Sequence, residues 1–292
     1  MKKISIILNT LFLLLLISCS SDNDNNELIN TNHLVKREYV SNNVNLEYRY
    51  NTNEHLIRII DIDNQEDIDS ETNFVYDSNN VVTRNFNSNI TNISSITNYS
   101  FNGNDKLLNA ISVINEPNNT INPTVTNIQE FSYNDNIITV NISSSVGDLV
   151  TVILEVNSLG LVNKMIKSEY YTTITYDSNE NISEIKTFDN NDNLVDTSEY
   201  IYDNKPNPFY GQLKSIYLPI FLSSFSNADV GVYGWDGYVG YDFPFLKNNI
   251  TSISENGNLD RDYTYQYNSE NYPINVIEIF NGINAFEYDI EY

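Results

Sequence analysis

Apolar and polar side chains alternate with a period of two over most of this chain. The pattern is clearest near the end of the sequence, where Phe286, Tyr288 and Ile290 are separated by acidic residues. Residues 45–50 and 261–267 repeat it with tyrosines on the apolar side. In an extended strand, successive side chains point to opposite faces, so this alternation predicts strands with one apolar and one polar face. No comparable run of apolar residues at helical spacing precedes residue 210.

The alternating segments are separated by short polar clusters of one recurring form. An aromatic residue is followed by Asn or Asp, then two or three polar residues, then an aliphatic residue. The copies begin at Tyr50, Tyr76, Phe101, Tyr133, Tyr176 and Tyr267. Asn, Asp and Gly tolerate the backbone angles of tight turns, and a spacing of roughly 20 to 30 residues is the length of a β-hairpin with its turns. The sequence therefore predicts an array of hairpins.

The first residues form a leader that is separate from this array. Lys2 and Lys3 precede an apolar stretch that ends at Leu16-Ile17-Ser18-Cys19, the layout of a secretory signal. The ending resembles the lipobox of bacterial lipoproteins, with Leu16, Ser18 and Cys19 at the matching positions. That resemblance implies cleavage after residue 18, acylation of Cys19 and, since Ser20 rather than Asp follows, an outer-membrane destination. Cys19 is the single cysteine of the chain, so no internal disulfide competes for its sulfur.

Three regions follow from these patterns. Residues 1–18 are the expected signal peptide, and residues 19–32 are a lipidated, polar and disordered tether, whose acidic start is also typical of lipoproteins exposed at the cell surface. Residues 34–292 form a single β-rich domain with an insertion at 203–249.

A second resemblance concerns this domain, because the Tyr-Asp units at Tyr76 and Tyr176 are similar to YD repeats of the RHS type.

With the lipobox and the segment 202–209, the chain resembles a group of bacterial lipoproteins of unknown function described as porin-like. The resemblance implies a rolled antiparallel sheet or a barrel. It assigns no activity to the chain, because the relatives are of unknown function. The expected fold is all-β: an antiparallel hairpin meander of roughly 16–18 strands, rolled into a barrel or a strongly curved sheet, because so many strands rarely stay open. The insertion is expected to be irregular or partly helical.

An integral outer-membrane barrel is the alternative architecture, since the alternating aromatic end at Tyr292 is typical of the last strand of such barrels. A lipid anchor would then be redundant. Strands of about seven residues, which we expect here, are also shorter than the nine to eleven that cross a membrane, and Thr, Ser and Asn occur on both faces.

The insertion at 203–249 concentrates aromatic residues around the single tryptophan. We expect Trp235, Tyr233, Tyr238 and Tyr241 to be possible ligand contacts, because such rings stack on sugars while Asp229, Asp236 and Asp242 accept hydroxyl protons. The competing interpretation is that Leu213–Phe225 closes one end of the barrel and that these aromatics are core. Exposed rings beside a groove would favour binding, and buried rings would favour a plug.

Composition narrows the classes of function. A net charge of −24 disfavours a nucleic-acid partner, which needs clustered cations. His33 and His55 are the only histidines, too few for a histidine-based catalytic triad, and no phosphate-binding glycine loop is present. The acidic turns 61–69 and 189–193 lack calcium-loop spacing. No metal site, cofactor or catalytic residue is therefore assigned.

The sequence favours a lipid-anchored envelope protein acting as a non-enzymatic binding or structural module, with the membrane, a glycan or another envelope protein as partner. A hydrolase that acts on a polysaccharide through two carboxylates remains the enzymatic alternative. The third hypothesis is a purely structural protein, in which the insertion is buried and there is no cleft.

Overall fold

In the computed structural model, residues 33–40, 43–63, 67–226, 238–280 and 282–292 are described. They form one antiparallel sheet of eighteen strands. The strands are β1 (Arg37–Val40), β2 (Asn43–Tyr50), β3 (Leu56–Ile62), β4 (Ile68–Asp77), β5 (Asn80–Ser88), β6 (Ser94–Phe101), β7 (Leu107–Asn115), β8 (Thr124–Asn134), β9 (Ile137–Ser144), β10 (Gly147–Val156), β11 (Val162–Ile166), β12 (Tyr170–Tyr176), β13 (Ile182–Asp189), β14 (Leu194–Pro206), β15 (Asn248–Glu255), β16 (Asn258–Tyr267), β17 (Pro273–Phe280) and β18 (Ile283–Glu291).

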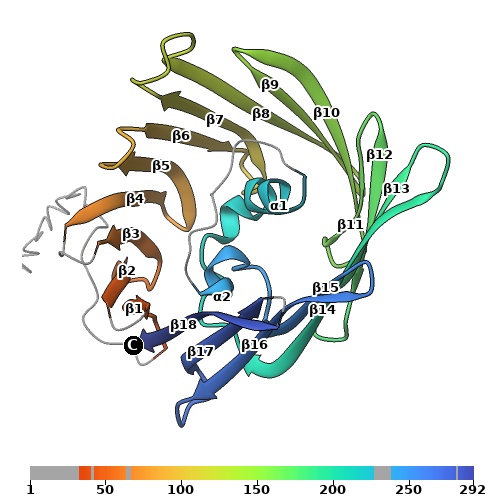
Figure 1. Ribbon diagram of the computed structural model, residues 1–292. Helices are drawn as coiled ribbons and strands as arrows, with labels where there is room; N and C mark the ends of the chain where they lie inside the picture. The colour runs from red at the N-terminus through yellow and green to blue at the C-terminus, as the bar shows by residue number, and fades with distance from the viewer. Residues whose placement is uncertain (1–32, 41–42, 64–66, 227–237, 281) are drawn as a thin grey trace, which may run out of the picture.

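The sheet closes into a barrel. Each strand pairs with its neighbours along the chain, and β1 also pairs with β18, where Arg37 lies opposite Glu291 and Val40 opposite Tyr288 (Figure 1). The predicted all-β hairpin meander is therefore confirmed in its closed form. Several strands are longer than the expected seven residues; β8, for example, has eleven. Strand length is thus no objection to an integral barrel.

The two faces of the wall differ as the alternation predicts. On β18 the buried Tyr288 and Ile290 point inward, whereas Glu287 and Asp289 are exposed on the outside. Polar side chains of neighbouring strands also bond to each other across the outer face, as Thr151 does when its hydroxyl donates to Asn141 at 3.0 Å. The outer face carries many polar side chains but also exposed apolar ones, such as Ile96, Ile111 and Ile201. The buried apolar and tyrosine side chains of the core line the lumen.

The turns that follow even-numbered strands lie together at one end of the barrel, which we call the Asx rim. At six turns the side-chain oxygen of an Asn or Asp accepts the backbone N–H groups two and four residues later. Five of these residues are at the Asx rim, and Asp189, at the opposite end, makes the same turn; the six are Asn51, Asn102, Asn157, Asp177, Asp189 and Asn268. The third residue after each has a positive φ, as at Glu180. This geometry explains the Asn or Asp in four copies of the turn motif. The copies after Tyr76 and Tyr133 are shorter turns, with positive φ at Ser78 and Asp135.

Six tyrosines near the ends of even-numbered strands stabilise the same rim, and three of them, Tyr76, Tyr133 and Tyr176, belong to the turn motif. Each points inward, and its hydroxyl donates to a backbone carbonyl near the start of the preceding strand, at 2.5 to 3.0 Å. The donors are Tyr76, Tyr133, Tyr176, Tyr202, Tyr265 and Tyr292. These hydroxyls provide hydrogen-bond donors for backbone carbonyls on the inner side of the rim.

Replacing Tyr202 with phenylalanine is expected to destabilise the protein by about 1 kcal/mol, because it removes a hydrogen bond and leaves a half-buried carbonyl without its donor. The hydroxyl of Tyr202 lies 2.6 Å from the carbonyl of Ile182, and burial raises the pKa of Tyr202. Urea unfolding would measure the change. Tyr210→Phe is the matched control, since that ring is exposed, and equal losses in both variants would contradict the assigned role.

The chain between β14 and β15 fills part of the lumen. It contains the 3-10 helix η1 (Lys214–Ile216), helix α1 (Tyr217–Ser226) and the short helix α2 (Val239–Asp242), all inside the ring of strands (Figure 1). The insertion is partly helical, as predicted. It is shorter than expected and covers residues 207–247, because β14 ends at Pro206 and β15 begins at Asn248. We call its described residues the plug. Neither helix in the described residues is long and apolar enough to cross a membrane.

Candidate functional site

The plug is anchored by the side chain of Asn207 at its start. Its amide nitrogen donates to the carbonyls of Gly240 at 3.2 Å, Phe243 at 3.2 Å and Leu246 at 3.1 Å. Its oxygen accepts the N–H of Phe209 at 2.9 Å. One buried asparagine therefore joins the first and last parts of the plug.

Aromatic packing fixes the plug against the wall beside α2. The ring of Phe209, fully buried, lies 5.0 Å from that of Tyr48 on β2 and 5.6 Å from that of Tyr241. Tyr238 is also fully buried, and its hydroxyl donates to Asn249 on β15. These rings belong to the core of the barrel.

A buried carboxylate joins the plug to the wall at the closing strand. Glu38 on β1 is inaccessible to solvent, and it accepts the N–H of Tyr238 at 2.8 Å and the hydroxyl of Tyr48 at 2.9 Å. Burial raises the pKa of Glu38 to about 7, against the lowering effect of the two hydrogen bonds. The carboxyl therefore changes charge near neutral pH.

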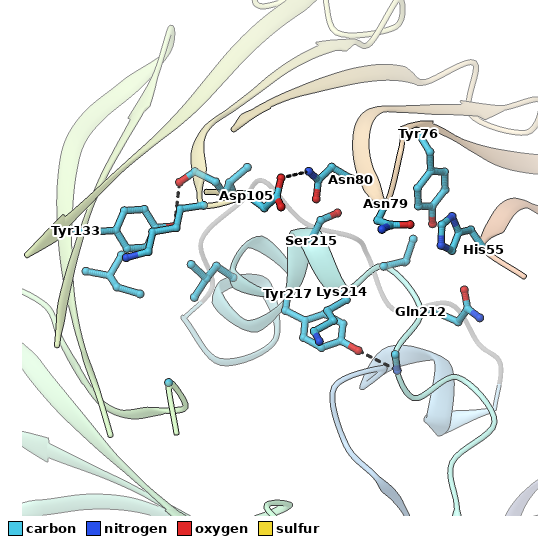
Figure 2. Close-up of a pocket in the computed structure, with 17 residues that line it drawn as sticks. His55, Tyr76, Asn79, Asn80, Asp105, Tyr133, Gln212, Lys214, Ser215 and Tyr217 are labelled. Carbon is cyan, nitrogen blue, oxygen red and sulfur yellow. Dashed lines mark hydrogen bonds between the residues drawn. The ribbon is translucent and has the colours of Figure 1, made fainter. Parts of the chain in front are cut away.

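A cavity of about 710 Å³ separates the other side of the plug from the wall. On the wall side it is lined by turns of the Asx rim, including Asn79, Asn80 and Asp105, and by Tyr76 and Tyr133. The plug contributes residues 211–215, 217 and 218. Figure 2 shows the wall residues on one side and Lys214, Ser215 and Tyr217 on the other.

The polar groups around this cavity are partly engaged with each other. Asn80 donates to Asp105 at 2.9 Å, and the ammonium group of Lys106 lies 4.9 Å from the centre of the Tyr133 ring. His55 stacks on Tyr76 with ring centres 4.8 Å apart. Asp105 is the one carboxylate among the lining residues. A two-carboxylate hydrolytic mechanism would need a second acid here.

The sequence-predicted residues fall into two groups. Cys19, Tyr233 and Trp235 lie outside the described residues, as do Asp229 and Asp236. Tyr238 and Tyr241 lie inside the barrel with exposed fractions of 0% and 2%. Burial is what the plug interpretation predicts for them, and contact of these tyrosines with a ligand stays a prediction. In the described residues, no group of three or more His, Cys, Asp or Glu is placed to hold a metal ion.

The sequence analysis did not assign the lining residues to a common site, although it named Tyr76 and Tyr133 as parts of the turn motif. They come from hairpin turns far apart in the chain and from the plug. One signal was present: Lys106 and Lys214 are among the few cations of a strongly acidic chain. Their convergence on one cavity depends on the barrel and on the path of the plug.

Comparisons with known proteins found distant similarity to solved structures of porin-like proteins. No protein-family model matches the chain, and no curated protein matches its sequence. A solved structure of a porin-like protein from Bacteroides vulgatus ATCC 8482 is 14% identical, with a TM-score of 0.42 over 89% of this chain and 98% of that chain. Another, of a porin-like protein from Bacteroides uniformis ATCC 8492, is 10% identical, with a TM-score of 0.36 over 68% of this chain and 91% of that chain. Because both scores are low, the barrel rests on the strand pairing of this chain.

Proposed function

We propose that this protein is a lipid-anchored, non-enzymatic binding module of the outer membrane, in which a closed barrel holds a plug and a rim cavity. The observation that carries the proposal is the orientation of the wall. Its outer face bears ion pairs such as Arg58 with Glu71 and Lys186 with Glu184, and its apolar side chains surround the plug. Lipid-facing walls of membrane barrels carry a continuous apolar outer band. Here the exposed apolar side chains of the outer face, such as Ile96, Ile111 and Ile201, lie among polar ones.

The tether would leave the barrel at the Asx rim. His33, at the start of the described chain, bonds to Glu54 in the turn after β2 at 3.2 Å, and its ring lies 6.3 Å from that of Tyr272 in the turn after β16. The expected anchor at Cys19 is therefore connected to the same rim as the cavity.

An integral outer-membrane barrel is the second candidate. It is favoured by the closed ring of antiparallel strands, an architecture that can span a bilayer. The ion pairs of the outer face oppose it, whereas the exposed Ile96, Ile111 and Ile201 on the same face favour it. The two candidates differ in what holds the protein at the membrane.

Replacing Cys19 with serine is expected to release the exported protein from the membrane fraction into the soluble periplasmic fraction. The lipid contributes about 0.8 kcal/mol per buried CH₂ group, and a polar barrel has no substitute for it. Ser20→Ala, which retains the lipobox cysteine, is the control and should remain with the membrane. Fractionation followed by immunoblotting measures both.

If Cys19→Ser remained in the membrane and resisted extraction with alkaline carbonate, the integral barrel would be the correct assignment. The proposal of a lipid-anchored module would then be wrong.

A further inference from the structure

We propose that the cavity between the plug and the Asx rim binds a short acidic oligosaccharide, with Lys106 and Lys214 holding its carboxylate groups. The inference rests on the proposed function as a binding module, and it names the site and the ligand class. Three features carry it: a preformed cavity, a lining of ring surface and amides, and two cations without acidic partners.

The cavity is preformed, because hydrogen bonds hold the plug against the wall at the edge of the cavity. Gln212 donates to the carbonyl of Glu54 at 2.9 Å and accepts the N–H of Leu56 at 2.9 Å. The hydroxyl of Ser215 accepts the N–H of Val81 at 2.9 Å. A ligand therefore enters a site whose backbone is already fixed, and little ordering opposes binding.

The lining matches the surface of a sugar. Tyr76 and Tyr133 contribute ring surface, and their orientation is fixed because each hydroxyl donates to a wall carbonyl. Flat aromatic surface packs against the C–H groups of a pyranose ring. Asn79 and Asn80 add amide groups to the lining, and amides can hydrogen-bond to the hydroxyl groups of a sugar. A volume of about 710 Å³ accommodates a short oligosaccharide.

The charges select an acidic sugar. Several cations of the described chain are paired with carboxylates, as Lys247 is with Glu180 and Arg58 with Glu71. Among the residues that the structure describes, five lysines have no ion pair: Lys36, Lys106, Lys164, Lys205 and Lys214. Two of these five, Lys106 and Lys214, line this one cavity from opposite sides. The overall charge of −24 repels a long polyanion, so the ligand carries few acidic groups.

The test is isothermal titration of the purified full chain, in detergent micelles, with trigalacturonate and with neutral 1,4-linked galactotriose. We expect trigalacturonate to bind and the neutral trisaccharide to bind at least tenfold more weakly. Lys106→Gln and Lys214→Gln should each weaken trigalacturonate binding about tenfold, since each removes one charge-assisted contact. Added salt should weaken binding by the wild-type protein.

Lys164→Gln is the matched control. Its ammonium group lies 4.7 Å from the centre of the Tyr171 ring, much as Lys106 lies over Tyr133, but on the outer wall. Unchanged affinity in this variant supports the proposal. Absence of trigalacturonate binding, equal binding of the neutral trisaccharide, or an equal loss in Lys164→Gln would each overturn it.

Mass spectrometry of the recovered trisaccharide separates this inference from the proposed function. Intact ligand supports both. Cleaved ligand, with binding lost in the two lysine variants, would support the cavity and contradict a non-enzymatic role. The fractionation experiment tests only the anchor at Cys19. Its outcome, whichever it is, does not change what the titration says about the cavity.

Discussion

Replacing Gly240 with alanine is expected to dislodge the plug and to lower the free energy of unfolding by about 3 kcal/mol, the upper part of the usual range for overpacking a core. A Cβ atom at this position would lie 2.6 Å from Cζ of Tyr238 and 2.7 Å from Oδ1 of Asn207. Neither neighbour has room to move, because both side chains are buried and hydrogen-bonded. Urea unfolding followed by tyrosine fluorescence would measure the loss.

Gly103→Ala is the control for this experiment. Gly103 lies in the turn after β6, and a Cβ atom there would have no heavy atom within 4 Å. We expect this variant to unfold within about 0.5 kcal/mol of the wild type, as surface substitutions usually do. A similar loss in both variants would show that the close packing around α2 does not hold the plug.

Replacing Glu38 with glutamine is expected to remove a pH dependence of about 3 kcal/mol from the stability of the protein. The pKa of Glu38 is raised from 4.5 to about 7 in the folded state, and each unit corresponds to about 1.4 kcal/mol. The folded state thus keeps this proton to a higher pH than the unfolded chain. Glu38 therefore favours folding most below pH 4.5, and its contribution falls as the pH rises to about 7 and then stays constant.

The measurement is the free energy of unfolding of both proteins at several values between pH 4.5 and pH 8. Glutamine retains an acceptor oxygen for the N–H of Tyr238, and its amide group can donate to the hydroxyl of Tyr48. The wild type should lose more stability than Glu38→Gln over this interval. Glu199→Gln, at an exposed position of β14, should keep the wild-type slope. Parallel slopes for wild type and Glu38→Gln would contradict the assignment.

The barrel was predictable because its determinants are local. Alternation orients each strand, and the Asn or Asp of each turn determines where the chain reverses, as at Asp177 and Asn268. When consecutive hairpins also pair with each other, the strands follow their order in the sequence, which is a meander. The sequence did not decide between a closed ring and a curved sheet, since closure depends on β1 and β18 meeting.

The site was less predictable because it depends on contacts between distant segments. Glu38 follows Lys36 and Arg37 in the sequence and looks like a solvent-exposed charge, yet the plug covers it. Tyr238 was recognised as one of an unusual group of aromatics, but its burial follows from the path of the insertion. Lys106 and Lys214 are separated by more than a hundred residues and meet only around the folded plug.

The pairing of β1 with β18 gives the ring a single seam between segments that are far apart in the sequence. Every other neighbouring pair joins consecutive strands, so those hairpins can form one after another as the chain emerges, whereas the seam carries the loop-closure entropy of nearly the whole domain. Glu38 lies on this seam opposite Ile290 and also binds the plug. The plug thus provides a surface on which the two edges can meet, and ring closure is expected to be the last and slowest step of folding.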